Sequence, residues 1–157
     1  MADILRDFEF CELHGSHRRA ERGSRRSRLP AYVDTGAGRT VVSSEVARRV
    51  GMIEAPDQVI DYAVPIRVRS RAFWTAMRMV EKGCVRWLPI LCAVSDEVIL
   101  ALDLPGGLQV LVGQDYLQHA RVRMDLAPSR EEGDQLVCRD PTGGPLGRRE
   151  ARSRRSR

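Results

Sequence analysis

A chain of 157 residues with 43% hydrophobic content is long enough for one globular domain that buries its own core. No apolar run approaches the roughly 18 residues of a membrane span, and the first seven residues lack the apolar core of a signal peptide. The four cysteines, at positions 11, 84, 92 and 138, have neither zinc-type spacing nor the density of a disulfide-rich secreted scaffold. We therefore expect a cytoplasmic protein in a reducing compartment that makes no membrane contact.

The positive charge of the chain is carried almost entirely by arginine. Lys plus Arg number 26 against 21 for Asp plus Glu, which gives a net charge of +5, and Lys82 is the single lysine. Six arginines lie within residues 18–28 and six more within residues 148–157. Because no nucleic-acid reader motif accompanies them, we expect any attraction of nucleic acid to come from these two arginine-rich segments through charge alone.

In chain order, weak apolar alternation predicts a first strand at residues 4–13. Residues 14–28 combine glycine, serine and arginine, which indicates a solvated loop. Pro30 then precedes the strand that delivers Asp34. A short helix is expected at residues 44–50, with a serine at its N-cap and Gly51 just beyond its end.

Further apolar runs predict the remaining elements. Residues 62–69 alternate with a period of two, and residues 72–80 are either their hairpin partner or a helix, because the apolar residues there also fit helical spacing. The Pro-Gly-Gly at 105–107 predicts a turn, and a last helix is expected at residues 116–120. The other predicted strands are residues 40–43, 85–94, 98–104, 108–112 and 122–126.

The strongest chemical signal is Asp34-Thr35-Gly36. A carboxylate at the end of a buried strand is desolvated, and a following glycine leaves backbone N–H groups able to donate to its oxygens, so its pKa is tunable. One carboxylate is a poor catalyst of amide hydrolysis, whereas two that share a proton supply a general base and a general acid. The chain contains a single Asp-Thr-Gly. A catalytic pair therefore requires a second copy of the chain, related by a two-fold axis.

Two stretches resemble the retropepsin-like aspartic proteases, a family that includes retroviral proteases and short bacterial relatives. Residues 31–37, Ala-Tyr-Val-Asp-Thr-Gly-Ala, followed by residues 40–43, are similar to the active-site loop of that family. Residues 110–117 match its pattern of two apolar residues, Gly, any residue, Asp, any residue, Leu. The resemblance implies a mostly β fold, a closed acid-protease barrel with one or two short helices.

The resemblance covers residues 29–126, which it implies to be the protease domain. Residues 1–28 would supply an N-terminal strand and the arginine-rich loop, and residues 127–157 a flexible arginine-rich tail. By the same resemblance the protein would be a homodimeric aspartic endopeptidase that binds extended peptide or protein substrates, with no metal or organic cofactor.

Roles for single residues follow from the resemblance. Asp34 would be the catalytic residue. Thr35 would hydrogen-bond across the dimer axis, and Gly36 would offer its N–H to the carboxylate. The loop would be supported by Thr35, Gly36 and Ala37, and the second structural motif would consist of Gly113, Asp115 and Leu117. From its residue type alone, Asp115 is a helix cap rather than a catalyst.

Alternatives remain beside the protease hypothesis. Residues 62–83 would be the flap that closes over bound peptide, but the glycine-rich tip of viral members is absent, and residues 69–71 or 81–83 would have to serve instead. A non-enzymatic binding module, which holds a protein or nucleic-acid partner in its groove or through its arginine-rich ends, is therefore the second hypothesis. Asp, Thr and Gly are also ordinary turn residues. A phosphate-binding loop at residues 36–40 is disfavoured, because Val33 and Arg39 replace the glycine and lysine that it needs.

Overall fold

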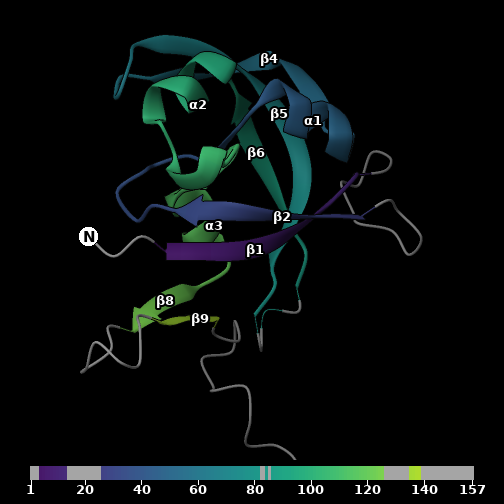
Figure 1. Cartoon of the computed structure of the whole chain (residues 1–157). Coiled ribbons are helices and arrows are strands. Elements are labelled where there is room, and N and C mark those ends of the chain that lie inside the picture. The colour runs from purple at the N-terminus through teal and green to yellow at the C-terminus, as the bar shows by residue number, and fades with distance from the viewer. Residues whose placement is uncertain (1–3, 14–25, 82–83, 85, 126–134, 139–157) are drawn as a thin grey trace, which may run out of the picture.

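The computed structural model describes residues 4–13, 26–81, 84, 86–125 and 135–138 (Figure 1). Most of this part of the chain is β-structure. Its strands are β1 (Ile4–Cys11), β2 (Arg26–Val33), β3 (Val41–Val42), β4 (Ile53–Tyr62), β5 (Val68–Met79), β6 (Leu88–Val94), β7 (Val110–Val112), β8 (Val122–Asp125) and β9 (Gln135–Cys138). Its helices are α1 (Ser44–Val50), α2 (Asp96–Leu102), the short 3₁₀ turn η1 (Pro105–Gly107) and α3 (Gln114–His119).

Six strands close into a barrel. The neighbours around it are β1, β2, β7, β3, β6 and β5, and β5 pairs again with β1. β4 continues the sheet beyond β5 as a terminal strand, and β8 pairs with β9 in a separate two-stranded sheet. Closure removes the unpaired edges that an open sheet would expose. The expected mostly β fold with a closed barrel is confirmed, although the described residues form three α-helices where one or two were expected.

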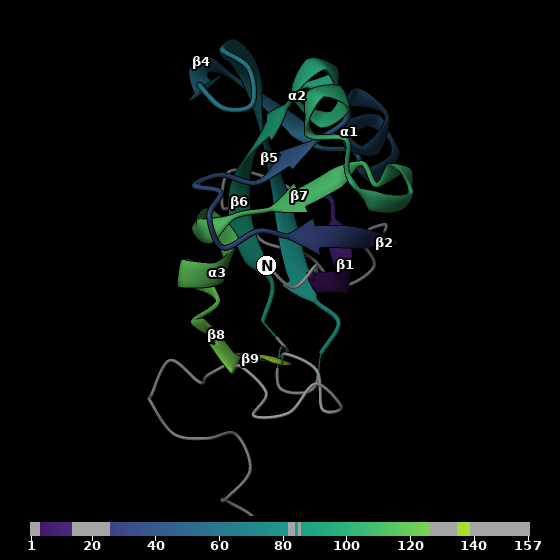
Figure 2. The same cartoon turned by 60° about the vertical axis from the view of Figure 1, so that its left-hand side comes forward.

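β7 lies between the two strands that flank the Asp34 loop. It runs parallel to β2, with Val112 opposite Val33, and antiparallel to β3, with Leu111 opposite Val41. Figure 2 shows β7 alongside β2. Because β2 and β7 are parallel, they end at the same edge of the sheet, and the residues that follow them meet there.

The core consists of apolar side chains on the inner faces of these strands. The main cluster includes Phe8, Phe10, Met79 and Tyr116, each at most 1% exposed. The rings of Phe8 and Tyr116 meet edge to face with centroids 5.2 Å apart, and the backbone N–H of Met79 donates to the Tyr116 hydroxyl at 2.9 Å. These contacts fix α3 against β5.

The ends of the helices follow from their capping residues. In α1 the hydroxyl of Ser43 accepts from the N–H of Val46, and Gly51 ends the helix in the left-handed conformation at φ 77°. The predicted helix at 44–50 is thus confirmed. The predicted strand at 98–104 is wrong, because α2 occupies Asp96–Leu102. Its N-cap is Ser95, whose hydroxyl accepts from the N–H of Val98 at 3.2 Å.

The long hairpin is formed by β4 and β5. β5 confirms the strand interpretation of residues 72–80, but the strand predicted at 62–69 is wrong, because residues 63–67 form the turn between β4 and β5. One proposed flap tip is wrong, and the other is described only in part. Residues 69–71 lie inside β5, and Glu81 follows β5 while residues 82 and 83 lie outside the described part of the chain. The turn includes Val64, which is 80% exposed.

The terminal segments are described only in part. Of the predicted loop at 14–28, residues 26–28 belong to β2, and residues 14–25 lie outside the described residues. Of the predicted tail at 127–157, the structure describes residues 135–138, which form β9 and pair with β8. The strand predicted at 122–126 corresponds to β8.

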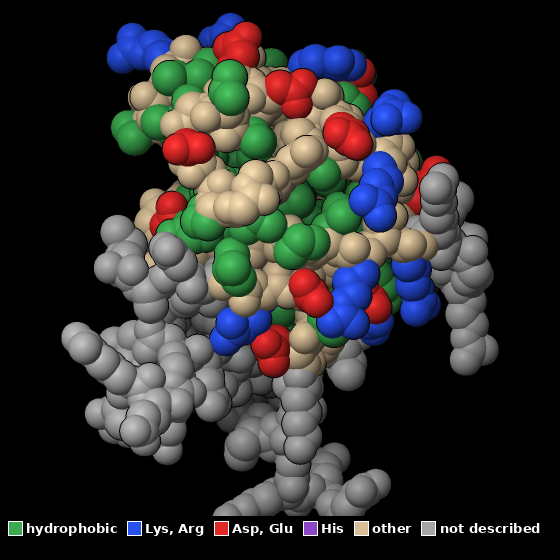
Figure 3. Space-filling view, viewed as in Figure 1, with side chains coloured by type: hydrophobic (Ala, Val, Ile, Leu, Met, Phe, Trp, Pro, Cys, Tyr) green, Lys and Arg blue, Asp and Glu red, His purple; other side chains and the backbone are tan. Residues whose placement is uncertain are grey.

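Charged side chains on the barrel pair with one another. On the face drawn in Figure 3, the acidic and basic side chains of the described residues are interspersed rather than gathered into a patch of one sign. Several arginines pair with carboxylates across neighbouring strands, in the pairs Arg28–Asp7, Arg78–Glu9, Arg71–Glu54 and Arg69–Asp61. Ion pairs between solvent-exposed side chains add little to stability, because water and salt screen their attraction.

The cysteines differ from one another in state. Cys84 takes part in a disulfide bond, whereas Cys11 and Cys92 are buried free thiols. Within the described residues, none of the helices is long and apolar enough to cross a membrane.

Candidate active site

Asp34 lies directly after β2, where the chain leaves the barrel. Its backbone N–H donates to the carbonyl of Val112 at 3.0 Å, which continues the pairing of β2 with β7 by one residue. The side chain is half-buried. The carboxylate follows a strand as predicted, but β2 is buried on one face only, because its residues alternate between exposed and buried as far as Val33, which is 3% exposed.

A tight turn holds the Asp34 carboxylate. The N–H of Gly36 donates to Asp34 Oδ1 at 2.8 Å, and the N–H of Ala37 donates to the Asp34 carbonyl at 3.2 Å. A Cβ atom on Gly36 would lie 3.2 Å from Asp34 Oδ1, so a side chain there would press on the carboxylate. The expected donation from Gly36 is present. Thr35 is exposed, and its hydroxyl has no hydrogen bond to any other described residue.

The second motif supports this loop from β7 and α3. The N–H of Gln114 donates to the Ala37 carbonyl at 2.8 Å, and its side-chain Nε2 donates to the Thr35 carbonyl at 2.6 Å. Gly113 lies so close to the loop that a Cβ would be 2.7 Å from the carbonyl carbon of Arg39 and 2.8 Å from the carbonyl oxygen of Ala37. The loop can approach β7 only because residue 113 has no side chain.

Asp115 has a different role from the one predicted. The N-cap of α3 is Gly113, and Asp115 lies inside the first turn. Its carboxylate accepts from the backbone N–H of Thr40 at 2.9 Å and from the Thr40 hydroxyl at 2.7 Å. It also accepts from the N–H of Tyr116 at 2.8 Å. Asp115 thus fastens the far end of the Asp34 loop to α3. The cap interpretation was wrong because α3 begins at Gln114, two residues before the predicted start.

Thr40 is a site residue that sequence reasoning missed. It is 0% exposed, and its hydroxyl both donates to Asp115 and accepts from the N–H of Gly113 at 3.2 Å. The partners lie 73 and 75 residues away in the sequence, so only a pairing of the two motifs could have suggested the contact. Leu117, the last residue of the second motif, is 5% exposed in the main core cluster and has a packing role.

The β4–β5 hairpin is joined to the same loop. The hydroxyl of Tyr62, the last residue of β4, donates to the Arg39 carbonyl at 2.9 Å. Tyr62 and Ile66 of the hairpin and Ala37 of the loop pack against one apolar cluster, and in Figures 1 and 2 the hairpin turn and the loop after β2 face the same side. Burial, with a smaller contribution from the Asp115 carboxylate, raises the pKa of the Tyr62 phenol well above its usual value. Tyr62 therefore remains a hydrogen-bond donor throughout the neutral range.

Other reactive groups do not join the site. Burial and then the Asp115 carboxylate raise the pKa of the Cys92 thiol, which makes it a poor nucleophile. Among the described residues, no group of three or more His, Cys, Asp or Glu side chains is placed to hold a metal ion. In this part of one chain, no hydrogen bond joins Asp34 to a second carboxylate. The site is therefore one carboxylate on a glycine turn at the edge of a closed β-barrel, facing a hairpin.

Comparisons with known proteins add the following. No protein-family model matches the sequence, and no curated protein is significantly similar to it. Among solved structures, the chain is similar to the EIAV protease complexed with the inhibitor HBY-793, at 21% identity and a TM-score of 0.40, over 63% of this chain and 83% of that one. It is also similar to the retroviral protease-like domain of Ddi1 from Leishmania major, at 19% identity and a TM-score of 0.39, over 64% of this chain and 74% of that one. What the site can do follows from its own residues.

Proposed function

We propose that the chain is one subunit of a homodimeric aspartic endopeptidase, with Asp34 as its catalytic residue. The observation that carries the proposal is the mounting of Asp34. Its carboxylate accepts from Gly36 at 2.8 Å on a turn that Gly113, Gln114 and Asp115 hold from behind. A carboxylate with fixed geometry and partial access to solvent has what a general base needs.

The proposed chemistry needs two copies of this half-site. The two Asp34 carboxylates would meet at a two-fold axis and share one proton, because like charges at that distance do not both ionise easily. The ionised carboxylate would take a proton from a water, which attacks the scissile carbonyl carbon while the protonated carboxyl donates to the carbonyl oxygen. The same pair would then protonate the leaving nitrogen. Extended substrate would lie between the loops and the β4–β5 hairpins and add strand-like hydrogen bonds.

Two features support the dimer requirement. The Asp34 loop is open on its outer side, with Thr35 and Gly36 exposed, so a second loop can approach it. Thr35, whose hydroxyl lacks a partner among the described residues, would find one across the axis.

The test is cleavage of a broad peptide library by the wild-type protein and by Asp34→Asn. The change removes the ionisable oxygen and keeps the shape and the acceptor for Gly36. The matched control is Asp103→Asn, because Asp103 is exposed at the end of α2 in the left-handed conformation, which Asn tolerates. We expect cleavage to fall about 10³-fold or more in Asp34→Asn and to be unchanged in the control. Cleavage that survives Asp34→Asn would exclude the mechanism.

Mixing the two proteins tests whether the site is shared. If each active site needs two Asp34 residues, wild type mixed with an equal amount of Asp34→Asn loses more activity than dilution explains, because half of the dimers become heterodimers. A monomeric enzyme would lose activity only in proportion to dilution. This measurement tests whether two chains share one active site, independently of whether Asp34 is the catalytic residue.

The second candidate is a binding module without catalysis, and the hairpin turn favours it. Residues 63–67 contain no glycine, and an exposed Val64 occupies the turn, so the turn lacks the flexibility of a glycine-rich flap. If the library is not cleaved and a peptide or nucleic acid binds instead, the module is the correct function. Nucleic-acid binding that weakens steeply with salt and is lost on deleting residues 148–157 would place it in the arginine-rich segments.

A further inference from the structure

A pocket of about 310 Å³ lies away from Asp34, where β5 changes its neighbour. One edge of β5 pairs with β4 as far as Trp74, which lies opposite Ile53, and with β1 from Ala76, which lies opposite Cys11. β6 occupies the other edge. The pocket opens at the junction of β1 and β4, between Leu13, Ile53 and Trp74.

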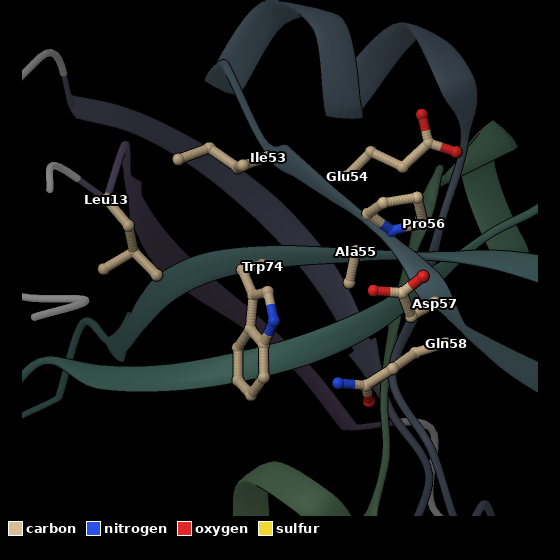
Figure 4. A pocket seen from close by; sticks show the side chains of 8 residues that line it. All are labelled: Leu13, Ile53, Glu54, Ala55, Pro56, Asp57, Gln58 and Trp74. Atoms are coloured by element: carbon tan, nitrogen blue, oxygen red, sulfur yellow. The ribbon is translucent and has the colours of Figure 1, made fainter. Parts of the chain in front are cut away.

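A bulge in β4 forms the other wall. Glu54 pairs with Phe73, but the next paired residue of β4, Val59, lies opposite Arg71. Residues 55–58 therefore face a single residue of β5 and arch away from the sheet. Figure 4 shows Asp57 and Gln58 from this bulge beside the Trp74 ring, with Leu13 and Ile53 on the other side. The pocket thus combines an apolar floor and an indole with a polar rim.

The rim carries negative charge. Two carboxylates, Glu54 and Asp57, line the pocket, and none of its lining residues is basic. Glu54 is already paired with Arg71, which donates to it through Nε at 2.7 Å and Nη2 at 2.5 Å. The Asp57 carboxylate has no hydrogen bond or ion pair with any described residue, and its side chain is exposed. One carboxylate is therefore available to a cationic ligand.

We propose that this pocket binds an arginine side chain of an extended peptide segment of a partner protein. A guanidinium is flat and weakly hydrated, and it can lie against an indole while its N–H groups donate to a carboxylate. The same molecule already contains this contact elsewhere, since the guanidinium carbons of Arg26 and Arg78 lie 5.5 and 4.6 Å from the ring centroid of Trp87. The three methylene groups of the arginine match the floor of Leu13 and Ile53.

The backbone of β4 supports an extended ligand. β4 is the terminal strand of the sheet and pairs only with β5 among the described strands, so its other edge offers N–H and C=O groups to an added strand. A peptide that pairs with this edge would pass the bulge and place one side chain over the pocket. Main-chain bonds would supply affinity without sequence preference, and the pocket would select arginine.

The probe is a short fluorescein-labelled peptide of alternating valine and threonine with one central arginine, compared with the same peptide containing citrulline. Citrulline keeps the shape and removes the charge. Binding is measured by fluorescence anisotropy to Asp34→Asn protein, so that cleavage cannot interfere, and to the same protein carrying Asp57→Asn. The matched control is Asp61→Asn, which removes the same charge from β4 outside the pocket, where Asp61 pairs with Arg69 on the surface.

We expect affinity for the arginine peptide to fall about tenfold in Asp57→Asn and to change less than about twofold in Asp61→Asn. The citrulline peptide should bind about tenfold more weakly than the arginine peptide and be insensitive to Asp57→Asn. When Trp87→Phe is introduced into the same protein, Trp74 is the single remaining tryptophan. The fluorescence of Trp74 should then change when the arginine peptide binds. The proposal is overturned if neither peptide binds, if both bind equally, or if Asp61→Asn weakens binding as much as Asp57→Asn does.

Discussion

Replacing Gly113 with Ala tests whether the Asp34 loop is held by close backbone contact. An alanine Cβ would lie 2.7–2.8 Å from three backbone atoms of Ala37 and Arg39, whereas ordinary contacts begin at 3.4 Å. The conformation itself suits alanine, since φ is −107° and ψ is −171°. The cost is therefore purely steric, and the loop has to move because backbone atoms cannot rotate away.

The size of the effect follows from two opposing contributions. Overpacking of this kind costs about 1–3 kcal/mol, and the lower entropy of the unfolded chain with alanine returns about 0.4–1 kcal/mol. We expect a net loss of about 1–2 kcal/mol in the free energy of unfolding, which corresponds to a fall in Tm of roughly 2–8 °C for a chain of this size. Urea denaturation measures the first quantity and calorimetry the second.

Gly38→Ala is the matched control, because a Cβ at position 38 would have nothing within 4 Å. It belongs to the same loop, so it repeats the entropic gain without the clash. We expect it to leave stability unchanged or to raise it by up to about 1 kcal/mol. Equal stability of the two variants would refute the account of how the loop is supported.

Three more predictions concern the contacts around this loop. Tyr62→Phe removes the hydroxyl that donates to the Arg39 carbonyl at 2.9 Å, so the free energy of unfolding should fall by about 0.5–1.5 kcal/mol. Amide hydrogen exchange should become faster in the Asp34 loop but not in β1. Unchanged exchange in the loop would show that the hairpin does not hold it. Thr40→Val leaves the buried Asp115 carboxylate without its hydroxyl donor, which should cost about 1.5–3 kcal/mol in urea denaturation, whereas Thr40→Ser, which keeps the hydroxyl, should lose clearly less. Burial raises the pKa of Tyr116 to about 12 and also raises the pKa of Tyr62, so the folded state favours the neutral phenols. The free energy of unfolding should therefore be intact below the unfolded phenol pKa of about 10 and fall as pH rises above it. A urea midpoint that stays constant from pH 9 to 11.5 would contradict this.

The strands of the barrel were largely predictable because their side chains alternate between core and surface. The Asp34 turn and the Gly113 motif were predictable as well, since each combines an apolar strand with a glycine where the backbone has to turn or approach closely. Their meeting in space is a consequence of β2 and β7 running in parallel, which the spacing of the motifs alone does not dictate.

The misses have local physical reasons. The start of β4 was not recognised because it contains proline and acidic residues, which are rare in central strands, and the structure places it at the end of the sheet with a bulge. The sequence predicts a strand where α2 lies, because a short apolar run fits either structure. Ser95 followed by two acidic residues is typical of a helix start and would have favoured a helix over a strand here.

The position of β7 between β2 and β3 has a consequence for the order of folding. The two strands that flank the Asp34 loop do not pair with each other, and each pairs with a strand that begins near residue 110. During synthesis from the N-terminus, the Asp34 turn therefore emerges long before β7 and α3 can support it. A nascent chain, or one truncated before Val110, carries the Asp34 turn without the contacts that Gly113, Gln114 and Asp115 make with its loop. The support of the Asp34 loop therefore depends on a three-residue strand, Val110–Val112, that is synthesised about 75 residues after it.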